Sequence, residues 1–229
     1  MSEARGLAVH AVVRNTRTDR ALDALHLRES RLEYELVPRG DLAAAVTAAP
    51  FRDATEPDPE ALRTHERVVE ALLRRSTLVP VPFGLVARDE HAVREFLARR
   101  REDLEDALEY LDNSYEMRVH VSLRAGGDGQ ALQGFLRMLH GSLRGQARAA
   151  RRLPGKDEGQ AAAAFLVGRG EWLRLVEKAT RWEGHHPEVE LRVTGPWPPY
   201  DFVTIEGPGE PDGGADLEAT HELDGEQDA

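Results

Sequence analysis

The sequence predicts an α+β protein with two domains, on the basis of three observations. Short apolar or alternating segments typical of β-strands are interspersed with longer segments of helical periodicity. A proline-rich, acidic stretch between Pro50 and Pro59 separates a small strand-and-helix unit from the rest of the chain. The sequence contains no internal repeat of solenoid length. We therefore expect an N-terminal α+β domain over residues 1–55, whose boundary could extend to about residue 75, and a second α+β domain over residues 56–205.

The N-terminal unit is expected to contain two strands and two short helices. The run LAVHAVV at Leu7–Val13 is apolar and rich in Val, which is typical of a buried strand. LEYELV at Leu32–Val37 alternates between apolar and polar residues, as a half-buried strand does. Thr16–Leu25 predicts a short helix. Pro38–Gly40 interrupts the second strand, and Asp41 could cap a helix that carries LAAAV.

The next segments predict helix, extended chain, helix and strand. Apolar residues recur at helical spacing from Pro59 to Arg75. TLVPVPFGLV at 77–86 is apolar and β-prone, but its two prolines cannot donate backbone hydrogen bonds, so we expect an edge strand or an irregular extended segment. A helix is expected to begin at Asp89 and run to Leu111. Tyr115–Leu123 alternates cleanly and predicts a half-buried strand.

Two helical stretches and two strands are expected after a glycine turn at 126–129. The first helical stretch is Ala131–Arg152, which would place a basic cluster at the helix C-terminus, where positive charge is favourable. The second is Gln160–Trp182, interrupted by two glycines. Strands are expected at Val189–Val193 and Tyr200–Ile205, on either side of a rigid GPWPP turn. The order of elements from residue 77 suggests a split βαβ sheet related to the ferredoxin-like arrangement.

Acidic residues are concentrated at the C-terminal end. The net charge of the whole chain is −11, and nine acids but no Lys or Arg lie beyond Ile205, so the preceding residues carry about −2. The end segment is also poor in bulky apolar residues, so we expect 206–229 to be a disordered acidic tail. Nucleic-acid binding requires a concentrated basic face, and a nearly neutral body with an acidic tail argues against it.

The sequence nominates no catalytic, cofactor or metal site. Cysteine is absent, which excludes disulfides and thiol catalysis. His65-Glu66 begins like a metalloprotease motif, but position 69 is Val, so a capping or surface histidine is the simpler interpretation. His185-His186 has no third ligand at a recognised spacing, and the glycines of 126–129 lack a phosphate-binding lysine. The sequence also contains no apolar stretch of about 18 residues that could span a membrane and no secretory signal, which fits a cytoplasmic protein.

The segment GPWPPYDF at 195–202 contains three prolines and three aromatic residues. Prolines restrict the backbone and reduce the entropy lost on ordering, while aromatic side chains offer large rigid contact areas. Two interpretations remain open: a rigid hairpin turn whose aromatics complete the core, or a surface that contacts a partner protein.

Two segments carry a resemblance to a known family. The first is HERVVEAL from His65, followed by LVPVPFG from Leu78 and then Asp89, and the second is VTGPWPPYDFV from Val193. Together they resemble the gas vesicle protein F/L family (GvpL/GvpF), over roughly residues 5–205. One departure is Phe165-Leu166, at a place where the family often has Tyr-Leu. The resemblance implies two α+β domains, the C-terminal one a modified ferredoxin-like fold, with no cofactor.

The resemblance also implies a function. Family members are expected to be accessory or minor structural proteins of gas vesicle formation, and therefore of buoyancy, located in the cytoplasm and on the vesicle. Their expected partners are the hydrophobic shell protein and other gas vesicle accessory proteins, and neither nucleic acid nor membrane. The candidate contact residues lie in the two proline-rich motifs: Pro80, Pro82, Phe83, Pro196, Trp197, Pro198 and Tyr200. A different class of function, a ligand-sensing regulatory module on a ferredoxin-like fold, is the alternative.

Deletion of residues 206–229 is expected to leave the melting temperature almost unchanged, because the segment has too few apolar residues to contribute to a core. Thermal unfolding of the full and shortened chains tests this. A loss of more than about 2 kcal/mol, which is large against the stability of a typical domain, would show that the segment packs against the rest.

Overall fold

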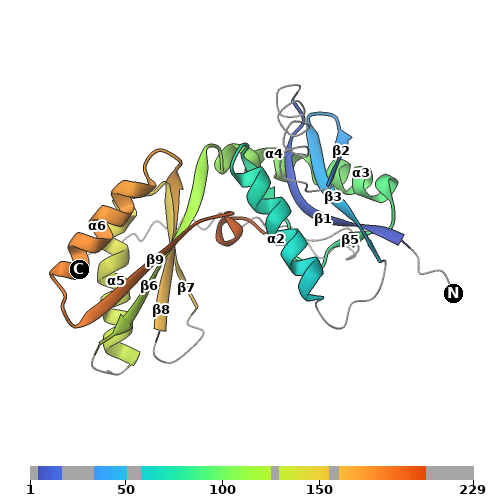
Figure 1. Cartoon of the computed structure of the whole chain (residues 1–229). Helices are drawn as coiled ribbons and strands as arrows, with labels where there is room; N and C mark the ends of the chain where they lie inside the picture. The colour runs from blue at the N-terminus through green and yellow to red at the C-terminus, as the bar shows by residue number, and fades with distance from the viewer. Residues whose placement is uncertain (1–4, 17–33, 51–57, 125–128, 155–159, 205–229) are drawn as a thin grey trace, which may run out of the picture.

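The structure, a computed structural model, contains two antiparallel sheets, each with helices packed against it (Figure 1). It describes residues 5–16, 34–50, 58–124, 129–154 and 160–204. Four predicted features lie wholly or mostly outside these residues: the Thr16–Leu25 helix, the Pro50–Pro59 stretch, the glycine turn and the acidic tail. Within the described ranges, no helix is long and apolar enough to cross a membrane.

The first sheet has the strand order β2-β3-β1-β4, with β5 also paired to β1. Its strands are β1 Arg5–Arg14, β2 Glu35–Arg39, β3 Leu42–Pro50, β4 Leu78–Pro80 and β5 Val86–Ala87. The strand predicted over Leu7–Val13 is confirmed as β1, and the second predicted strand corresponds to β2. The interruption predicted at Pro38–Gly40 is wrong for Pro38 and Arg39, because both pair with β3 as part of β2. The proline-rich segment at 77–86 supplies the edge strand β4 and the short β5, in agreement with its expected edge position.

The helix predicted to carry LAAAV is wrong, because these residues form the interior strand β3. Gly40 adopts a φ of +61° in the tight turn between β2 and β3, so the chain returns directly as a hairpin. Ala43 and Ala45 face one core, while Ala44 faces the other, and all are fully buried. Alanine favours helices in isolation, but pairing on both sides of β3 overrides that preference.

A β-bulge at His10 changes which residues of β1 face each of the two cores. The register with β3 shifts between Val9 and Ala11, so Val9 and Val12 face one side of the sheet while Ala11 and Val13 face the other. The bulge therefore changes which side of the strand each residue after it occupies.

Helices cover both faces of the first sheet. Helix α2, Pro59–Leu73, begins at the capping residue Asp58 and packs on the face that holds Ala11 and Val13. Helices α3 (Glu90–Arg99) and α4 (Arg101–Tyr110) pack on the opposite face. The single helix expected from Asp89 to Leu111 is therefore two helices, because Arg100 has φ −102° and ψ 20°, outside the helical region.

The second sheet has the order β7-β8-β6-β9. Its strands are β6 Ser114–Leu123, β7 Ala149–Leu153, β8 Gln160–Gly168 and β9 Val189–Trp197. Helices α5 (Gly129–Leu143) and α6 (Trp172–Gly184) pack on one face of this sheet, and the short 3-10 helix η1 (Arg144–Gln146) follows α5. The strand predicted over Tyr115–Leu123 is confirmed as β6, and that over Val189–Val193 as part of β9.

Both long helical stretches predicted for this half extend too far. The first ends at Leu143, and strand β7 follows, so Arg151 and Arg152 lie on a strand and not at a helix C-terminus. The start of the second is β8, with α6 beginning only at Trp172. The alanine-rich run in β8 is buried on both faces, and an apolar run of this kind shows no strand alternation in the sequence.

The two sheets meet through their shared packing. Leu166 of β8 belongs to the core of the first sheet, whereas its neighbour Phe165 points into the core beneath α5 and α6. After β9 the chain forms the 3-10 helix η2, Tyr200–Phe202, where a strand was predicted, and Phe202 and Val203 pack against the first core. Because β4 and β5 pair with β1, the domain boundary expected near Pro50–Pro59 does not coincide with the division between the sheets.

Leu166→Ala is expected to lower the free energy of unfolding by about 2–5 kcal/mol, because it removes a fully buried side chain at the junction of the sheets. The matched control is Leu173→Ala on α6, whose side chain is 55% exposed and whose loss should change stability by less than about 0.5 kcal/mol. Denaturant unfolding measures both. Equal effects would mean that the contact between the sheets contributes little.

Candidate partner-binding site

His65 brings the two proline-rich motifs together. It lies on the buried face of α2, where its ring packs edge-on against Phe83 with centroids 5.6 Å apart. Its Nε2 atom is 3.0 Å from the hydroxyl oxygen of Tyr200. The interpretation of His65 as a capping or surface residue is therefore wrong. The residue joins segments that are more than a hundred positions apart in the sequence.

A chain of hydrogen bonds continues from His65 into the first sheet. The Nδ1 atoms of His65 and His10 are 3.0 Å apart, and Nε2 of His10 is 2.9 Å from Oγ1 of Thr47. One Nδ1 must donate and the other accept, and the hydroxyl groups at both ends can adopt either role. Two neutral histidines can therefore form every hydrogen bond in this series, from Thr47 through His10 and His65 to Tyr200. A doubly protonated pair would lose the bond in the middle.

Burial keeps this chain neutral at neutral pH. Desolvation, and then the proximity of His65, lowers the pKa of His10 to about 4. Burial also lowers the pKa of His65. It raises the pKa of Tyr200 to about 12, with smaller contributions from the charges of Glu66 and Glu116. These groups therefore hold segments together and do not carry charge.

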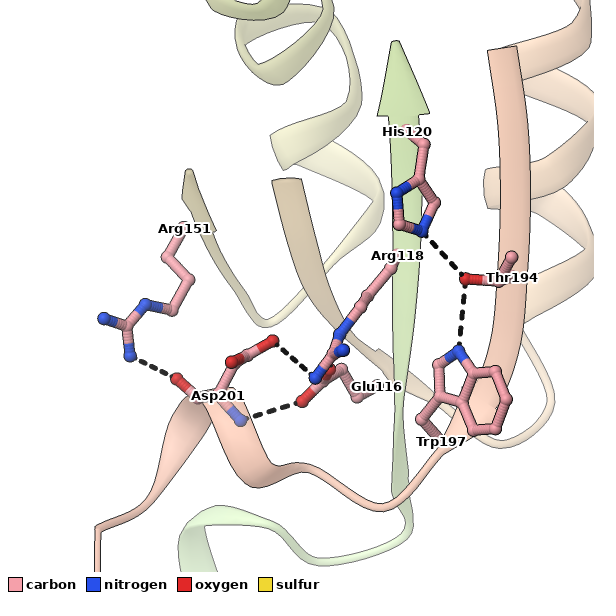
Figure 2. Close-up of polar contacts among 7 residues, drawn as sticks. All are labelled: Glu116, Arg118, His120, Arg151, Thr194, Trp197 and Asp201. Atoms are coloured by element: carbon pink, nitrogen blue, oxygen red, sulfur yellow. Dashed lines mark hydrogen bonds and ion pairs between the residues drawn. The ribbon is translucent and has the colours of Figure 1, made fainter. Parts of the chain in front are cut away.

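A second polar network fixes the segment after β9 to the sheet, as Figure 2 shows. Glu116 on β6 is fully buried and accepts hydrogen bonds from Nε of Arg118 at 2.5 Å and from the backbone N–H of Asp201 at 2.9 Å. Nη2 of Arg118 also lies 2.9 Å from the Asp201 carboxylate, and Arg151 donates to the Asp201 carbonyl. Asp201, the central residue of η2, is thereby attached to two strands.

Burial of Glu116 has an electrostatic cost. Desolvation raises its pKa to about 7, and the nearby carboxylate of Asp201 adds to the rise. The hydrogen bond from the backbone N–H of Asp201 and the positive charge of Arg118 oppose it. The carboxylate is therefore near the point of protonation at neutral pH, while its contacts keep η2 in place.

Trp197 is held in a fixed orientation although its side chain is 46% exposed. Its indole N–H donates to Oγ1 of Thr194 at 3.2 Å, and Nε2 of His120 lies 3.3 Å from the same oxygen (Figure 2).

The rigid turn predicted at GPWPP is wrong for its first three residues, because β9 continues through Gly195 and Pro196 to Trp197, and its register with β6 shifts between Glu116 and Arg118. In this irregular stretch of β9, Gly195 has φ +125°. A Cβ there would lie 2.8 Å from the sulfur of Met117.

The seven predicted contact residues divide into three groups. Pro80 is buried at the end of β4, while Pro82 and the 37%-exposed Phe83 reach the surface beside it. Pro196 and Trp197 are exposed at the end of β9. Pro198 and Tyr200 are half-buried, and Tyr200 is joined to Phe83 through His65.

Sequence reasoning missed the residues that hold this site in place: His10, Glu116 and Arg118. Their only local signal is a polar residue within an apolar or alternating strand, and their partners are far away in the sequence. No group of three or more His, Asp or Glu side chains that could hold a metal ion occurs among the residues that the structure describes.

Comparisons with known proteins give a consistent result. A family model described as gas vesicle synthesis protein GvpL/GvpF matches residues 9–133 and 129–204. Gas vesicle protein L of Streptomyces sp. is 27% identical, over 74% of this chain and 83% of its own. Gas vesicle protein F2 of Halobacterium salinarum is also 27% identical, over 69% of this chain and 76% of its own.

Solved structures share the fold. The crystal structure of GvpF from Anabaena sp. PCC7120 superposes with a TM-score of 0.70 at 16% identity, covering 88% of this chain and 97% of that one. GvpF from Microcystis aeruginosa gives a TM-score of 0.65 at 14% identity, covering 87% and 99%.

Acid is expected to weaken the histidine chain, and His10→Gln should isolate the effect. Because the pKa of His10 is lower in the folded state than in the unfolded state, the unfolded state takes up a proton first as the pH falls below 6.5. Between pH 7.5 and pH 5 the wild type should lose about 2 kcal/mol of unfolding free energy relative to His10→Gln. Denaturant unfolding at both pH values measures this difference.

Glu116→Gln provides a control of opposite sign. The pKa of Glu116 is raised on folding, so the wild type should gain stability relative to this variant as the pH falls through the same range. If the His10→Gln difference did not change with pH, His10 would not be held neutral in the folded protein.

Proposed function

Because the chain belongs to the GvpL/GvpF family of gas vesicle synthesis proteins, we propose that it is an assembly accessory or minor structural protein that contacts the hydrophobic shell protein during vesicle formation. Membership of the family gives the chain a gas vesicle-related role, and the contact with the shell protein is the step that we add.

The observation that carries this proposal is the exposed but fixed ring of Trp197. An exposed aromatic side chain usually loses rotational freedom on binding, which reduces affinity. The indole of Trp197 already has its N–H bonded to Thr194, and Pro196, which precedes it in β9, restricts the backbone. A fixed tryptophan of this kind is suited to act as an anchor for an apolar surface such as that of a shell protein.

A second anchor is Phe83, which packs against His65 with more than a third of its surface exposed. The titratable groups around both anchors have structural partners: His65 with His10 and Tyr200, Glu116 with Arg118. We therefore infer binding and no catalysis at this site. The partners that we propose are the shell protein and other gas vesicle accessory proteins, met in the cytoplasm and on the vesicle.

The arrangement of the second sheet supports the finer assignment of its fold. The elements β6, α5, β7, β8, α6 and β9 follow one another as βαββαβ, and the strand order is β7-β8-β6-β9. This is the split βαβ pattern, so we propose that the C-terminal half is a modified ferredoxin-like domain.

Trp197→Ala and Phe202→Ala should have separable effects. Trp197 is exposed, so its loss should leave thermal unfolding nearly unchanged but weaken binding to the shell protein by about 2 kcal/mol, close to thirtyfold. Phe202 packs against the first core, so its loss should mainly lower the melting temperature. Thermal unfolding and pull-down with purified shell protein measure the two effects.

Leu173→Ala serves as a binding control, because it removes an exposed apolar side chain from α6, away from the motif. If Trp197→Ala unfolded the protein, the ring would be part of the fold and not a contact. If that variant were stable and bound the shell protein normally, the contact surface would lie elsewhere, with Phe83 the next residue to test.

A further inference from the structure

Cationic residues are concentrated in one stretch of an otherwise acidic chain. The net charge of the whole sequence is −11, yet residues 129–156 contain no Asp or Glu. The described part of this stretch forms helix α5, the 3-10 helix η1 and strand β7, which adjoin in the fold. The cations of the stretch are Arg137, Arg144, Arg148, Arg151, Arg152 and Lys156.

Three of these arginines lie together on one flank of α5 and β7. Arg137 of α5 and Arg144, the first residue of η1, are seven residues apart, so they lie on the same side of the helix axis, with His140 between them. Arg152 lies opposite Ala163, which faces the core beneath α5, so Arg152 is on the helix side of the sheet. Burial is the main cause that lowers the pKa of His140, and the charges of Arg152 and Arg144 lower it further, so both arginines lie near this ring. We call Arg137, Arg144 and Arg152 the basic flank.

The charge of the basic flank is not offset within the described part of the chain. Its three arginines are exposed, and none forms an ion pair with another described residue. Phe135 of α5 contacts His186, just beyond the end of α6. Arg137 follows Phe135 by two residues, a rotation of about 200° around the helix. Helix α6, with its acidic residues, and the basic flank therefore lie on opposite sides of α5.

The acidic C-terminal segment starts beside this flank. Arg151 of β7 donates to the carbonyl of Asp201, and the two residues after Asp201 pack against the same core as Ala149, the first residue of β7. The described chain ends at Thr204. Beyond Ile205 the sequence contains nine acids and no Lys or Arg. The strongest negative charge of the chain therefore begins next to its strongest positive charge.

The length of the segment and the state of the other arginines both favour the basic flank. Ten residues of extended chain span up to about 35 Å, which exceeds the roughly 22 Å of a 15-residue helix such as α5. On the other side of the second sheet, Arg118 and Arg151 already bind Asp201, and Arg118 also binds Glu116. That side offers the acidic segment no comparable set of free guanidinium groups.

We propose that the acidic segment beyond Ile205 docks on the basic flank of its own chain, with its carboxylates against Arg137, Arg144 and Arg152. Guanidinium groups bind carboxylates in a bidentate geometry. The same chain is favoured over another molecule, because attachment beside β7 gives the segment a high effective concentration. Ion pairs between exposed groups contribute little to stability, which agrees with the small effect expected from deletion of 206–229. This contact is independent of the one proposed for Trp197 with the shell protein.

The test places a spin label in the acidic segment of the full chain. The sequence contains no cysteine, so Thr220→Cys gives a single site for a nitroxide. The unpaired electron broadens the NMR amide signals of residues that come close to it. At low salt, the signals of α5, η1 and β7 should broaden more than those of β2 in the first sheet. About 1 M salt, at which the Debye length is about 3 Å, should remove most of this broadening.

Matched variants identify the groups responsible. Changing the three arginines of the basic flank to glutamine should remove most of the broadening, and changing them to lysine should preserve most of it. A control variant with three exposed arginines of the first half changed to glutamine loses the same charge and should behave as the wild type. The control residues are Arg14, Arg39 and Arg88. Dispersed amide signals show that each variant is folded before it is compared.

The other outcomes would overturn the proposal. Absent or evenly distributed broadening in the wild type at low salt would exclude docking on the flank. Equal loss in the flank and control glutamine variants would show attraction to the charge of the whole chain. Spin-labelled chain without ¹⁵N is also mixed with unlabelled ¹⁵N wild type. Broadening of the ¹⁵N signals to the same extent in this mixture would identify a second copy, and not the same chain, as the source of the docked segment.

Discussion

The attachment of the segment after β9 is the constraint on which the arrangement of the two halves depends. This segment leaves the second sheet, bonds to Glu116 and Arg118 through Asp201, and inserts Phe202 and Val203 into the core of the first sheet. Tyr200, which directly precedes Asp201, reaches His65 on α2. The same few residues therefore pack against the first core and attach it to the second sheet.

Two ways of stabilising a buried polar group are combined here. The two histidines of the chain are neutral, and each of their ring nitrogens has a hydrogen-bond partner. Burying them therefore costs little free energy, apart from the cost of keeping them unprotonated. Glu116 is buried with a charged partner, and desolvation largely cancels the attraction. The first network contributes little electrostatic energy but requires a specific geometry. The second network is more valuable for orienting η2 than for stability.

Local patterns predicted the parts of the fold that are determined locally. The alternation of β6, the start of a helix at Asp89 and the edge position of the prolines at 77–86 each follow from neighbouring residues, and the structure confirms them. The sequence predicts helices where β3 and β8 lie, because their alanines acquire a strand conformation only through pairing on both sides. The site was predicted in part. The two aromatic motifs were evident, but their connection through His65 depends on a contact across 135 positions.

The bulge at His10 affects how related sequences are to be aligned. A single extra residue in β1 separates two stretches whose inward and outward positions are out of step. Consider a homologue that lacks this extra residue. If it is aligned without a gap of one position at the bulge, its residues on one side of the bulge are matched with residues that face the opposite side of the sheet in this chain. Substitution patterns averaged across such an ungapped column would mix residues that face α2 with residues that face α3 and α4, and would make a well-defined strand look variable.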